Sequence, residues 1–273
     1  MIITTLVENT VNKPDLLGEH GLSFLLESEN DTILFDTGQG YTILHNAEKM
    51  GVDLAKVSKV ILSHGHYDHT GGLKSILNLV HDANIYGHPN IFEKKYSKDG
   101  QKTRYIGMPY TKEELESKCV SLHLSRKPIQ IADGICTTGE IDRQVDFETI
   151  SDRLCVMRDG NLEKDDLLDD LSLVVSGQEG VAVVLGCGHS GIINTLTQVR
   201  KVTDNAPISI VIGGIHLIDA NNDRIHKTIH LLREFDIEKL ALCHCTGMKA
   251  MAEIYKAFDD KLIIYNVGNR IEF

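Results

Sequence analysis

The stretch ILSHGHYDHTGG, residues 61–72, places three histidines and one aspartate within six positions, directly after an apolar run. The four side chains are His64, His66, Asp68 and His69, in the pattern H-x-H-x-D-H. On a tight turn, His64 and His66 can direct two imidazoles to one point, while Asp68 and His69 serve a neighbouring point. Imidazole nitrogen and carboxylate oxygen are ligands of zinc, iron and manganese, so this turn is predicted to be a metal site rather than a solvated loop.

Short strands and helices surround this turn. Residues 57–62, which end in three apolar side chains, are a candidate for a short buried strand, and residues 73–80 carry apolar side chains at helical spacing. The turn therefore follows a strand end, where functional residues are often held by a rigid scaffold. Further strands are expected at residues 2–8, 22–27, 32–35, 83–86, 129–131, 154–158, 172–176, 181–185, 208–212, 240–243 and 262–265, and helices at residues 41–50, 192–202, 224–235 and 248–258. Because strands are followed by helices in two similar blocks, we expect two sheets packed face to face with helices outside.

Residues 88–118 interrupt this regular pattern. They are polar and rich in lysine, and they show no periodicity before Thr111 and Glu114, which have the spacing of a helix capping box. We interpret the segment as an inserted excursion or lid. No Pro-rich or Gly-rich linker divides the chain, which favours a single domain over residues 1–273.

Composition and charge restrict the class of protein. The formal net charge of −11 argues against a general nucleic-acid binder, which needs clustered Lys and Arg, but it allows a small anionic substrate held by local positive groups. No apolar run approaches the roughly 20 residues of a membrane-spanning helix, and residues 1–5 contain no basic leader segment. The cysteines form no CxxC pair, which favours a reducing compartment: Cys119, Cys136, Cys155, Cys187, Cys243 and Cys245. We predict a cytoplasmic protein with a small-molecule substrate and neither nucleic acid nor membrane as partner; the sequence leaves the oligomeric state open.

The motif SHGHYDHTGG, residues 63–72, resembles that of the metallo-β-lactamase superfamily of metal-dependent hydrolases. The resemblance implies an α/β fold, a four-layer αββα sandwich, that binds one or two divalent metal ions, with zinc favoured and iron or manganese as alternatives. It extends over nearly the whole chain. Asp36 in LFDTG matches an aspartate that supports the site by hydrogen bonding, while His189 in GCGHSGIIN and His244 in CHCTG match later ligands. The implied ligands are His64, His66 and His189 for one metal ion, and Asp68, His69 and His244 for the other.

One departure from the family pattern concerns a bridging aspartate. Many members carry it as a Gly-Asp pair between the third and last ligands, but residues 212–217 read IGGIHL here. His216 is a candidate to replace it as a ligand or to contact the substrate, with a structural role as the alternative. Without a bridging carboxylate the second metal ion is expected to be weakly bound or absent. Cys243 and Cys245 alternate with His244 on an expected strand, so they should face away from it as packing residues.

Several further residues are candidates for substrate contact. Glu19 and His20 precede a strand and either reach the metal site or belong to a plain loop. His88 begins the excursion, which also carries Lys94, Lys95, Lys102 and Arg104. Solvated side chains are favoured for the lysines of an exposed excursion, and phosphate or carboxylate contact is the alternative, with Arg104 as the preferred contact. His226 and His230 stand four residues apart on an expected helix; without an HExxH pattern, a solvent-facing pair is favoured over a zinc site.

The stretches GEHGLSFLLE (residues 18–27), FDTG, GCGHSGIIN, GGIHL and CHCTG are together similar to one branch of the superfamily, named after 7,8-dihydropterin-6-methyl-4-(β-D-ribofuranosyl)aminobenzene-5'-phosphate synthase. The superfamily resemblance implies a hydrolase in which a metal-bound hydroxide attacks a phosphoester, lactone or related small ester, with Asp68 as a catalytic residue that orients the water. The branch resemblance implies an alternative, a pterin-condensing transferase that releases pyrophosphate. Di-iron redox chemistry and a non-catalytic metal-binding module are the less favoured alternatives.

Overall fold

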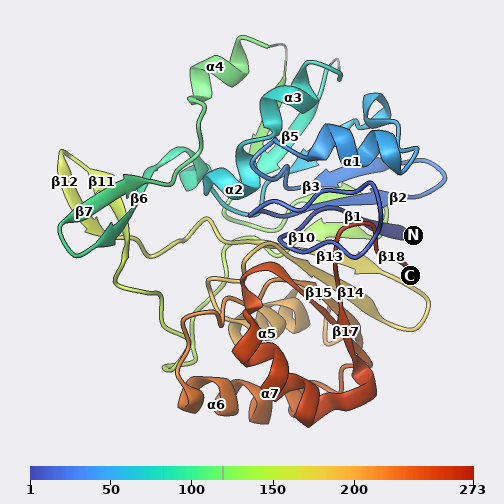
Figure 1. The fold of residues 1–273 in the computed structure, drawn as a ribbon, viewed down its shortest axis with the longest axis vertical. Coiled ribbons are helices and arrows are strands. Elements are labelled where there is room, and N and C mark those ends of the chain that lie inside the picture. Colours follow the sequence, from blue (N-terminus) through green and yellow to red (C-terminus); the bar gives the residue numbers. More distant parts are fainter. Residues whose placement is uncertain (81, 119) are drawn as a thin grey trace. The chain divides into compact units, whose positions relative to one another are not determined.

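The computed structural model describes residues 1–80, 82–118 and 120–273, which fall into two compact units (Figure 1). The first unit comprises residues 1–125, 150–169 and 266–272, and the second comprises residues 126–149, 170–265 and 273. Each unit has its own seven-stranded sheet and its own apolar core. Cys119 lies outside the described residues, and the single domain over residues 1–273 stays a prediction.

The main sheet of the first unit has the strand order β18-β1-β2-β3-β4-β5-β8. Its strands are β1 (Ile2–Val7), β2 (Ser23–Glu27), β3 (Thr32–Phe35), β4 (Lys59–Ile61), β5 (Asn84–Gly87), β8 (Ser121–Leu124) and β18 (Arg270–Glu272). The neighbours β3, β4, β5 and β8 are parallel. Since parallel strands end at the same edge of a sheet, this topology brings together the segments that follow β3, β4 and β5, which include Asp36, the His-rich turn and His88.

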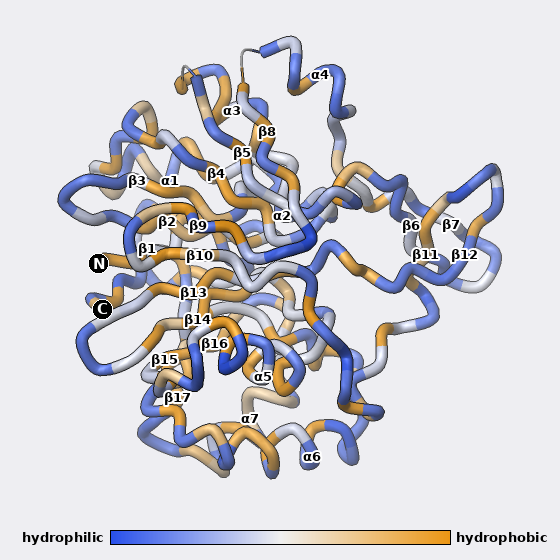
Figure 2. The backbone as a smooth tube through the Cα atoms, turned by 180° about the vertical axis from the view of Figure 1, so that it is seen from behind, coloured by the Kyte–Doolittle hydropathy of each residue, from blue (hydrophilic) through white to orange (hydrophobic). Residues whose placement is uncertain are grey.

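Helices of the first unit bury apolar side chains beside this sheet. They are α1 (Ile43–Lys49), α2 (Tyr67–Thr70), α3 (Leu73–Leu77) and α4 (Lys112–Glu116). Ile43, Ala47, Leu73 and Ile76 belong to one core cluster with side chains of the central strands, which appear as hydrophobic segments in Figure 2. The capping box predicted at Thr111 and Glu114 is present at the start of α4.

The structure corrects the interpretation of residues 88–118 as a patternless excursion. This segment contains β6 (Lys94–Asp99) and β7 (Lys102–Tyr105), which join β11 (Leu154–Arg158) and β12 (Asn161–Lys164) in an antiparallel sheet of order β12-β11-β6-β7. All four residues of β7 and all four of β12 are exposed, so both faces carry polar side chains and the sequence lacks the alternation that marks a half-buried strand. The expected strand at residues 154–158 is β11, paired directly with β6.

The second unit is a mixed sheet of order β17-β16-β15-β14-β13-β10-β9. Its strands are β9 (Gln130–Ala132), β10 (Ile135–Thr137), β13 (Ser172–Ser176), β14 (Val181–Leu185), β15 (Ile208–Gly213), β16 (Lys239–Leu242) and β17 (Leu262–Ile264). The strands β14, β15, β16 and β17 are parallel. Three helices, α5 (Ile192–Val202), α6 (Asn222–Leu232) and α7 (Met248–Phe258), run beside this sheet in Figure 1, and their buried side chains share one core with it.

The predicted elements are found with ends that differ by a few residues. The strands that the sequence analysis missed are short or exposed, such as β10 and β12. None of the helices in the described part of the chain has the length and apolar character needed to cross a membrane.

Candidate metal centre

Asp36 and Ser63 fix the orientation of two histidines in the first unit. Asp36 directly follows β3, and its carboxylate accepts hydrogen bonds from the N–H and the Oγ–H of Ser63, both at 2.7 Å. The same carboxylate lies 2.7 Å from His69 Nδ1, and Ser63 Oγ lies 2.9 Å from His64 Nδ1. These contacts favour the tautomers with a proton on Nδ1, which leaves the lone pair of each ring on Nε2.

The four side chains of the His-rich turn lie close together. His64 Nε2 lies 2.9 Å from His66 Nδ1, and Asp68 Oδ2 lies 3.7 Å from His69 Nε2. The rings of His64 and His69 are also near each other, with centroids 4.3 Å apart, so the division of these ligands between two metal ions stays a prediction. Burial lowers the pKa of His66 to about 3, since the opposing charge of Asp68 is too weak to compensate. The ring is therefore neutral near pH 7, which is the form that binds a metal ion.

Two glycines let the backbone of this turn approach its neighbours closely. A Cβ atom on Gly65 would lie 2.2 Å from Ile91 O, and one on Gly72 would lie 2.2 Å from Thr37 O. Both distances are far below any real contact, so only glycine fits at either position. Gly65 allows the turn to pack against the 3-10 helix η2 (Pro89–Phe92). Gly72 allows the C-terminal end of the turn to pack against the segment after β3.

A buried ion cluster supports the same turn. Lys95, on β6, is fully buried, and its Nζ lies 2.9 Å from Asp165 Oδ2 and 2.8 Å from Asp169 Oδ1. The second oxygen of Asp169 accepts a hydrogen bond of 2.7 Å from the Gly65 N–H, between the two histidines. Burial alone would lower the pKa of Lys95, but Asp169 and Asp165 raise it, so the ammonium group stays charged. Lys95 is therefore neither a solvated side chain nor a phosphate contact, because its charge is enclosed and paired.

The second unit carries a second set of ligand-type side chains at one edge of its sheet. Cys187 and His189 follow β14, His216 follows β15, and His244 and Cys245 follow β16. Because these strands are parallel, their ends meet at the same edge. His189 and His216 have ring centroids 4.0 Å apart. Two groups have their ligand atoms within 4.8 Å of one another: Cys187 with His189 and His216, and Cys187 with His244 and Cys245.

The position of Cys245 differs from the expectation that it faces away from His244. The strand β16 ends at Leu242, and His244 has a φ of 53°, which begins a 3-10 helix rather than another strand residue. Strand alternation therefore does not reach Cys245, and its sulfur lies within 4.8 Å of the nearest His244 ring nitrogen. Burial opposes ionisation of this thiol, but hydrogen bonds with Cys187 and His216 and the His244 charge bring the pKa of Cys245 well below its usual value.

Two carboxylates that the sequence analysis missed hold the turn at His189. Asp170 Oδ2 accepts a hydrogen bond of 2.8 Å from the Ser190 N–H, and Glu148 accepts bonds of 2.9 Å from the N–H groups of Ile193 and Asn194 at the start of α5. Burial raises the pKa of Asp170 to about 6 although the Ser190 contacts oppose this. The sequence signal for Asp170 was the Asp-Asp pair before β13; Glu148, in an irregular segment, had none.

The structure assigns different surroundings to the predicted substrate contacts Glu19 and His20. The Glu19 carboxylate accepts hydrogen bonds from four successive backbone N–H groups, those of residues 39–42, at 2.9 to 3.2 Å. It therefore stabilises the loop before α1, which corrects its proposed substrate role. His20 Nε2 lies 3.2 Å from Asp68 Oδ2, and 56% of its side chain is exposed. His20 is thus placed beside a predicted ligand, with access to solvent.

His88 and Arg104 occupy very different positions in the first unit. His88 is fully buried, and its Nδ1 accepts a hydrogen bond of 3.1 Å from the Asn90 N–H at the start of η2. This hydrogen bond gives His88 a structural role. Because the side chain is buried, it has no exposed surface for a substrate, which contradicts its prediction as a substrate contact. Arg104 is exposed on β7, with its guanidinium 5.3 Å from the centroid of the Tyr67 ring, next to His66.

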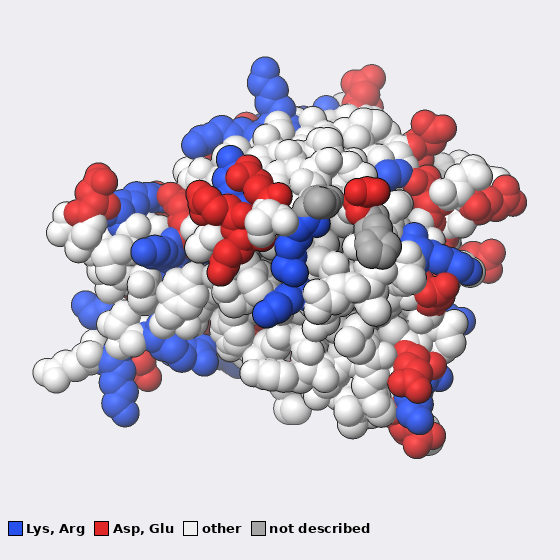
Figure 3. Space-filling model, turned by 90° about the horizontal axis from the view of Figure 1, so that it is seen from above, with Lys and Arg blue, Asp and Glu red and all other residues white. Residues whose placement is uncertain are grey.

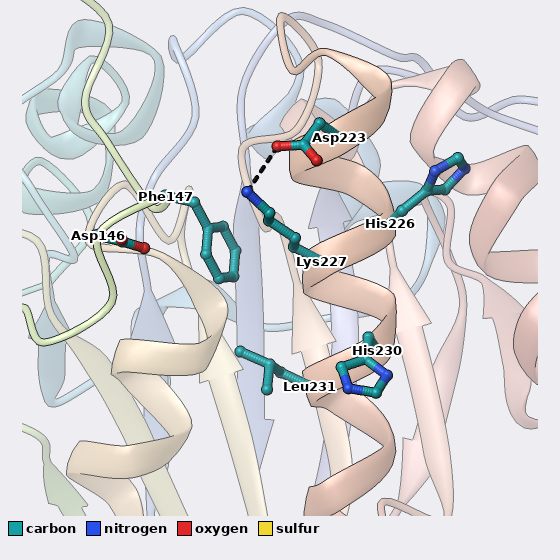
Figure 4. Close-up of a pocket in the computed structure, with 7 residues that line it drawn as sticks. All are labelled: Asp146, Phe147, Asp223, His226, Lys227, His230 and Leu231. Atoms are coloured by element: carbon teal, nitrogen blue, oxygen red, sulfur yellow. Dashed lines mark ion pairs between the residues drawn. The ribbon is translucent and has the colours of Figure 1, made fainter.

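A separate groove lies on the second unit beside α6. It has a volume of about 540 Å³ and is lined by Asp146, Phe147 and the exposed face of α6, including His226, Lys227 and His230 (Figure 4). Lys227 pairs with Asp223 at 2.8 Å, whereas Ile225, Ile229 and Leu232 face the core. The solvent-facing histidine pair predicted on this helix is confirmed.

Comparison with known proteins identifies the family. Residues 17–198 match the family model described as the metallo-beta-lactamase superfamily. The chain belongs to this superfamily. It is 34% identical over 267 residues to the 7,8-dihydropterin-6-methyl-4-(beta-D-ribofuranosyl)-aminobenzene-5'-phosphate synthase of Methanocaldococcus jannaschii, covering 93% of this chain and 90% of that protein.

Solved structures agree with this membership. Tm1679, a metal-dependent hydrolase of the beta-lactamase superfamily, matches with a TM-score of 0.85 and 31% identity over 100% of this chain and 99% of that chain. Zinc-bound PqqB from Methylobacterium extorquens shares the fold with a TM-score of 0.61 at 10% identity, with both chains fully covered. The predicted α/β fold of the metallo-β-lactamase type is confirmed.

The residues present fit the divalent metal ions that this superfamily binds. The first unit offers imidazole nitrogens and a carboxylate oxygen, and the second offers imidazole nitrogens and thiol sulfurs. Imidazole and carboxylate donors suit zinc, iron and manganese, whereas thiol sulfurs suit zinc and iron. The imidazole and carboxylate donors alone do not select one metal among the three.

Proposed function

We propose that this chain is a metal-dependent hydrolase of a phosphoester, lactone or related small ester. The proposed ligands are those assigned by family resemblance: His64, His66 and His189 for one ion, and Asp68, His69 and His244 for the other. The observation that carries the proposal is the set of hydrogen bonds that Asp36 and Ser63 make with His69 and His64. These bonds occupy Nδ1 of each ring and leave the Nε2 lone pair available for a metal ion. A buried network of this kind is typical of metal ligands and is not needed for a solvated loop.

The residues of this chain have distinct roles in such a hydrolysis. A bound divalent metal ion supplies charge neutralisation and lowers the pKa of water in its vicinity. Asp68 accepts the proton of the attacking water, whose oxygen forms the new bond to phosphorus or carbon as the ester oxygen leaves. His20, 3.2 Å from Asp68 and more than half exposed, relays this proton toward the leaving oxygen or solvent. Asp36 keeps the ring of His69 from rotating during the reaction.

A second candidate function is synthase activity. It is favoured by the 34% identity with the dihydropterin synthase of Methanocaldococcus jannaschii. In such a condensation a new bond would form between a pterin methylene carbon and the aminobenzene acceptor, pyrophosphate would leave, and the acceptor would lose one proton to solvent. The same ligand set would neutralise the charge of the pyrophosphate instead of activating water.

A substrate panel separates the two functions. We expect the purified protein to contain a divalent metal ion and, when supplied with zinc, manganese or iron(II), to hydrolyse at least one small phosphoester, cyclic phosphate or lactone. Release of pyrophosphate from a dihydropterin diphosphate only when an aminobenzene acceptor is present would instead support the synthase. No turnover of any substrate by metal-loaded protein would contradict both and favour a metal-binding module.

The surface agrees with a small substrate rather than a polyanion. On the face shown in Figure 3, Lys and Arg side chains are interspersed with Asp and Glu, and no continuous basic tract crosses it. A nucleic-acid backbone would need such a tract. The proposed partner is therefore a small molecule, and a cytoplasmic location stays a prediction.

Arg104 is the proposed contact for an anionic substrate. Its guanidinium packs over Tyr67, the residue between His66 and Asp68. Charge-assisted hydrogen bonds contribute about 1.5–3 kcal/mol, so Arg104→Ala should raise KM for a phosphorylated substrate by about tenfold or more, with a smaller effect on kcat. Steady-state kinetics with phosphorylated and neutral substrates measure this. Lys102→Ala, on the same exposed strand, is the control, and equal KM values for Arg104→Ala and wild type would refute the contact.

A further inference from the structure

Cys187 is the shared member of both ligand groups in the second unit. Its sulfur lies within 4.8 Å of ligand atoms of His189 and His216 in one group, and of His244 and Cys245 in the other. The side chain is buried, with 3% of the residue exposed. A sulfur that belongs to both groups is placed to contact two cations, one in each group.

The backbone around Cys187 is closely packed and has glycine where neighbouring atoms leave no room for a side chain. Gly214 donates its N–H to Gly186 O at 3.0 Å, and a Cβ on Gly214 would lie 2.6 Å from Cys245 Sγ. Gly188 has a φ of 61°, which glycine adopts without strain. Cys245 Sγ–H donates to Cys187 O at 3.3 Å. The backbone segments that follow β14 and β15 therefore approach each other closely, and Cys245 Sγ occupies the space that a side chain at position 214 would need.

These two groups contain imidazoles and thiols but no carboxylate. Two metal ions close to each other repel, and a negatively charged ligand between them reduces that repulsion. The stretch IGGIHL, residues 212–217 at the end of β15, supplies no such charge. Among the members of the two groups, a thiolate at Cys187 is the anionic donor common to both.

We propose that Cys187 is a metal ligand whose thiolate is shared by two cations, with His189 and His216 beside one of them and His244 beside the other. The inference rests on the proposed function, since it adds a ligand to the same metal centre. When the metal binds, the Cys187 S–H bond breaks, the proton passes to solvent, and the sulfur lone pairs form the metal–sulfur bonds. A sulfur ligand also favours zinc or iron over manganese, which prefers oxygen.

X-ray absorption on the zinc-loaded wild-type protein tests this directly. We expect a sulfur shell at about 2.3 Å in addition to nitrogen and oxygen at about 2.0–2.2 Å. Because this measurement needs no variant and no substrate, it does not depend on how substitutions affect folding. Bound zinc with only nitrogen and oxygen ligands would overturn the Cys187 inference and leave the proposed hydrolase intact. Failure of the wild-type protein to bind any metal would overturn both.

Variants identify which sulfur is responsible. Cys187→Ser should lose the sulfur shell and about half of the bound zinc, whereas Cys187→Asp should lose the sulfur shell but retain the zinc, because a carboxylate also bridges cations. Cys245→Ser is the neighbouring control and should keep both the shell and the metal content. Cys155→Ser, a buried cysteine of β11 outside the ligand groups found in the described chain, controls for loss of any buried thiol. Loss of the sulfur shell in Cys245→Ser with retention in Cys187→Ser would refute the assignment.

Discussion

His66→Ala is expected to lose bound metal and turnover together, with metal affinity and kcat/KM each reduced at least about 100-fold. The imidazole nitrogens of His64 and His66 lie 2.9 Å apart, so both can contact one ion and removal of either leaves that ion with a solvent ligand in its place. Loss of a residue that only orients a ligand already weakens metal binding by about 10–100-fold, and loss of the ligand itself should cost at least as much. Elemental analysis after dialysis and steady-state kinetics measure the two effects.

The matched control for this prediction is His226→Ala. His226 is an exposed histidine on α6, beside the groove of Figure 4, and belongs to none of the ligand groups found in the described chain. Its loss should change neither metal content nor turnover. Thermal unfolding of both variants establishes that each is folded. Full activity in a metal-stripped His66→Ala protein would show that the chemistry does not use a metal at this turn.

The features that could be predicted from the sequence are those marked by a local pattern of apolar residues or by a motif of residues with a known chemistry. The strand ahead of the His-rich turn is marked by the apolar residues 60–62, and the helix after the turn is marked by apolar side chains at helical spacing, so β4 and α3 were found. The family motif then predicted the superfamily that the comparisons establish. Asp36 was selected from its motif, and its contacts with Ser63 and His69 are those of a residue that orients ligands.

The features that escaped prediction depend on contacts between distant segments. Lys95 looks like its exposed neighbours in the sequence, and only the pairing of β6 with β11, followed by residues 165–169, shows that it is buried. The Glu19 carboxylate binds backbone N–H groups about twenty residues further along, for which no sequence pattern exists. Cys245 was misplaced because strand alternation was extended beyond Leu242, where β16 ends, and past the positive φ of His244. Tertiary pairing and single backbone dihedrals are not encoded in hydrophobic periodicity.

Lys95→Ala is expected to destabilise the protein by about 3–5 kcal/mol, because it leaves two buried carboxylates without their cation. Asp165 and Asp169 both lie within 3 Å of the ammonium nitrogen, and all three side chains are almost completely buried. Chemical denaturation measures the change in unfolding free energy. Arg158→Ala, which breaks a half-exposed ion pair with Glu93, should cost less than about 1 kcal/mol and serves as the control.

The position of Asp169 makes metal affinity a second quantity to measure. Metal affinity would not depend on Asp169 if the ion cluster supported only the fold. Its Oδ2 holds the Gly65 N–H between His64 and His66, so Asp169→Ala should weaken metal binding by about 10–100-fold even where the variant is fully folded. Asp169→Asn keeps an acceptor for Gly65 and should retain most of the metal affinity while losing stability. Asp165→Asn, which also reduces the charge beside Lys95 but does not contact Gly65, should lose stability alone. Equal metal affinities for Asp169→Ala and Asp165→Asn would show that the cluster supports the fold without positioning the ligands.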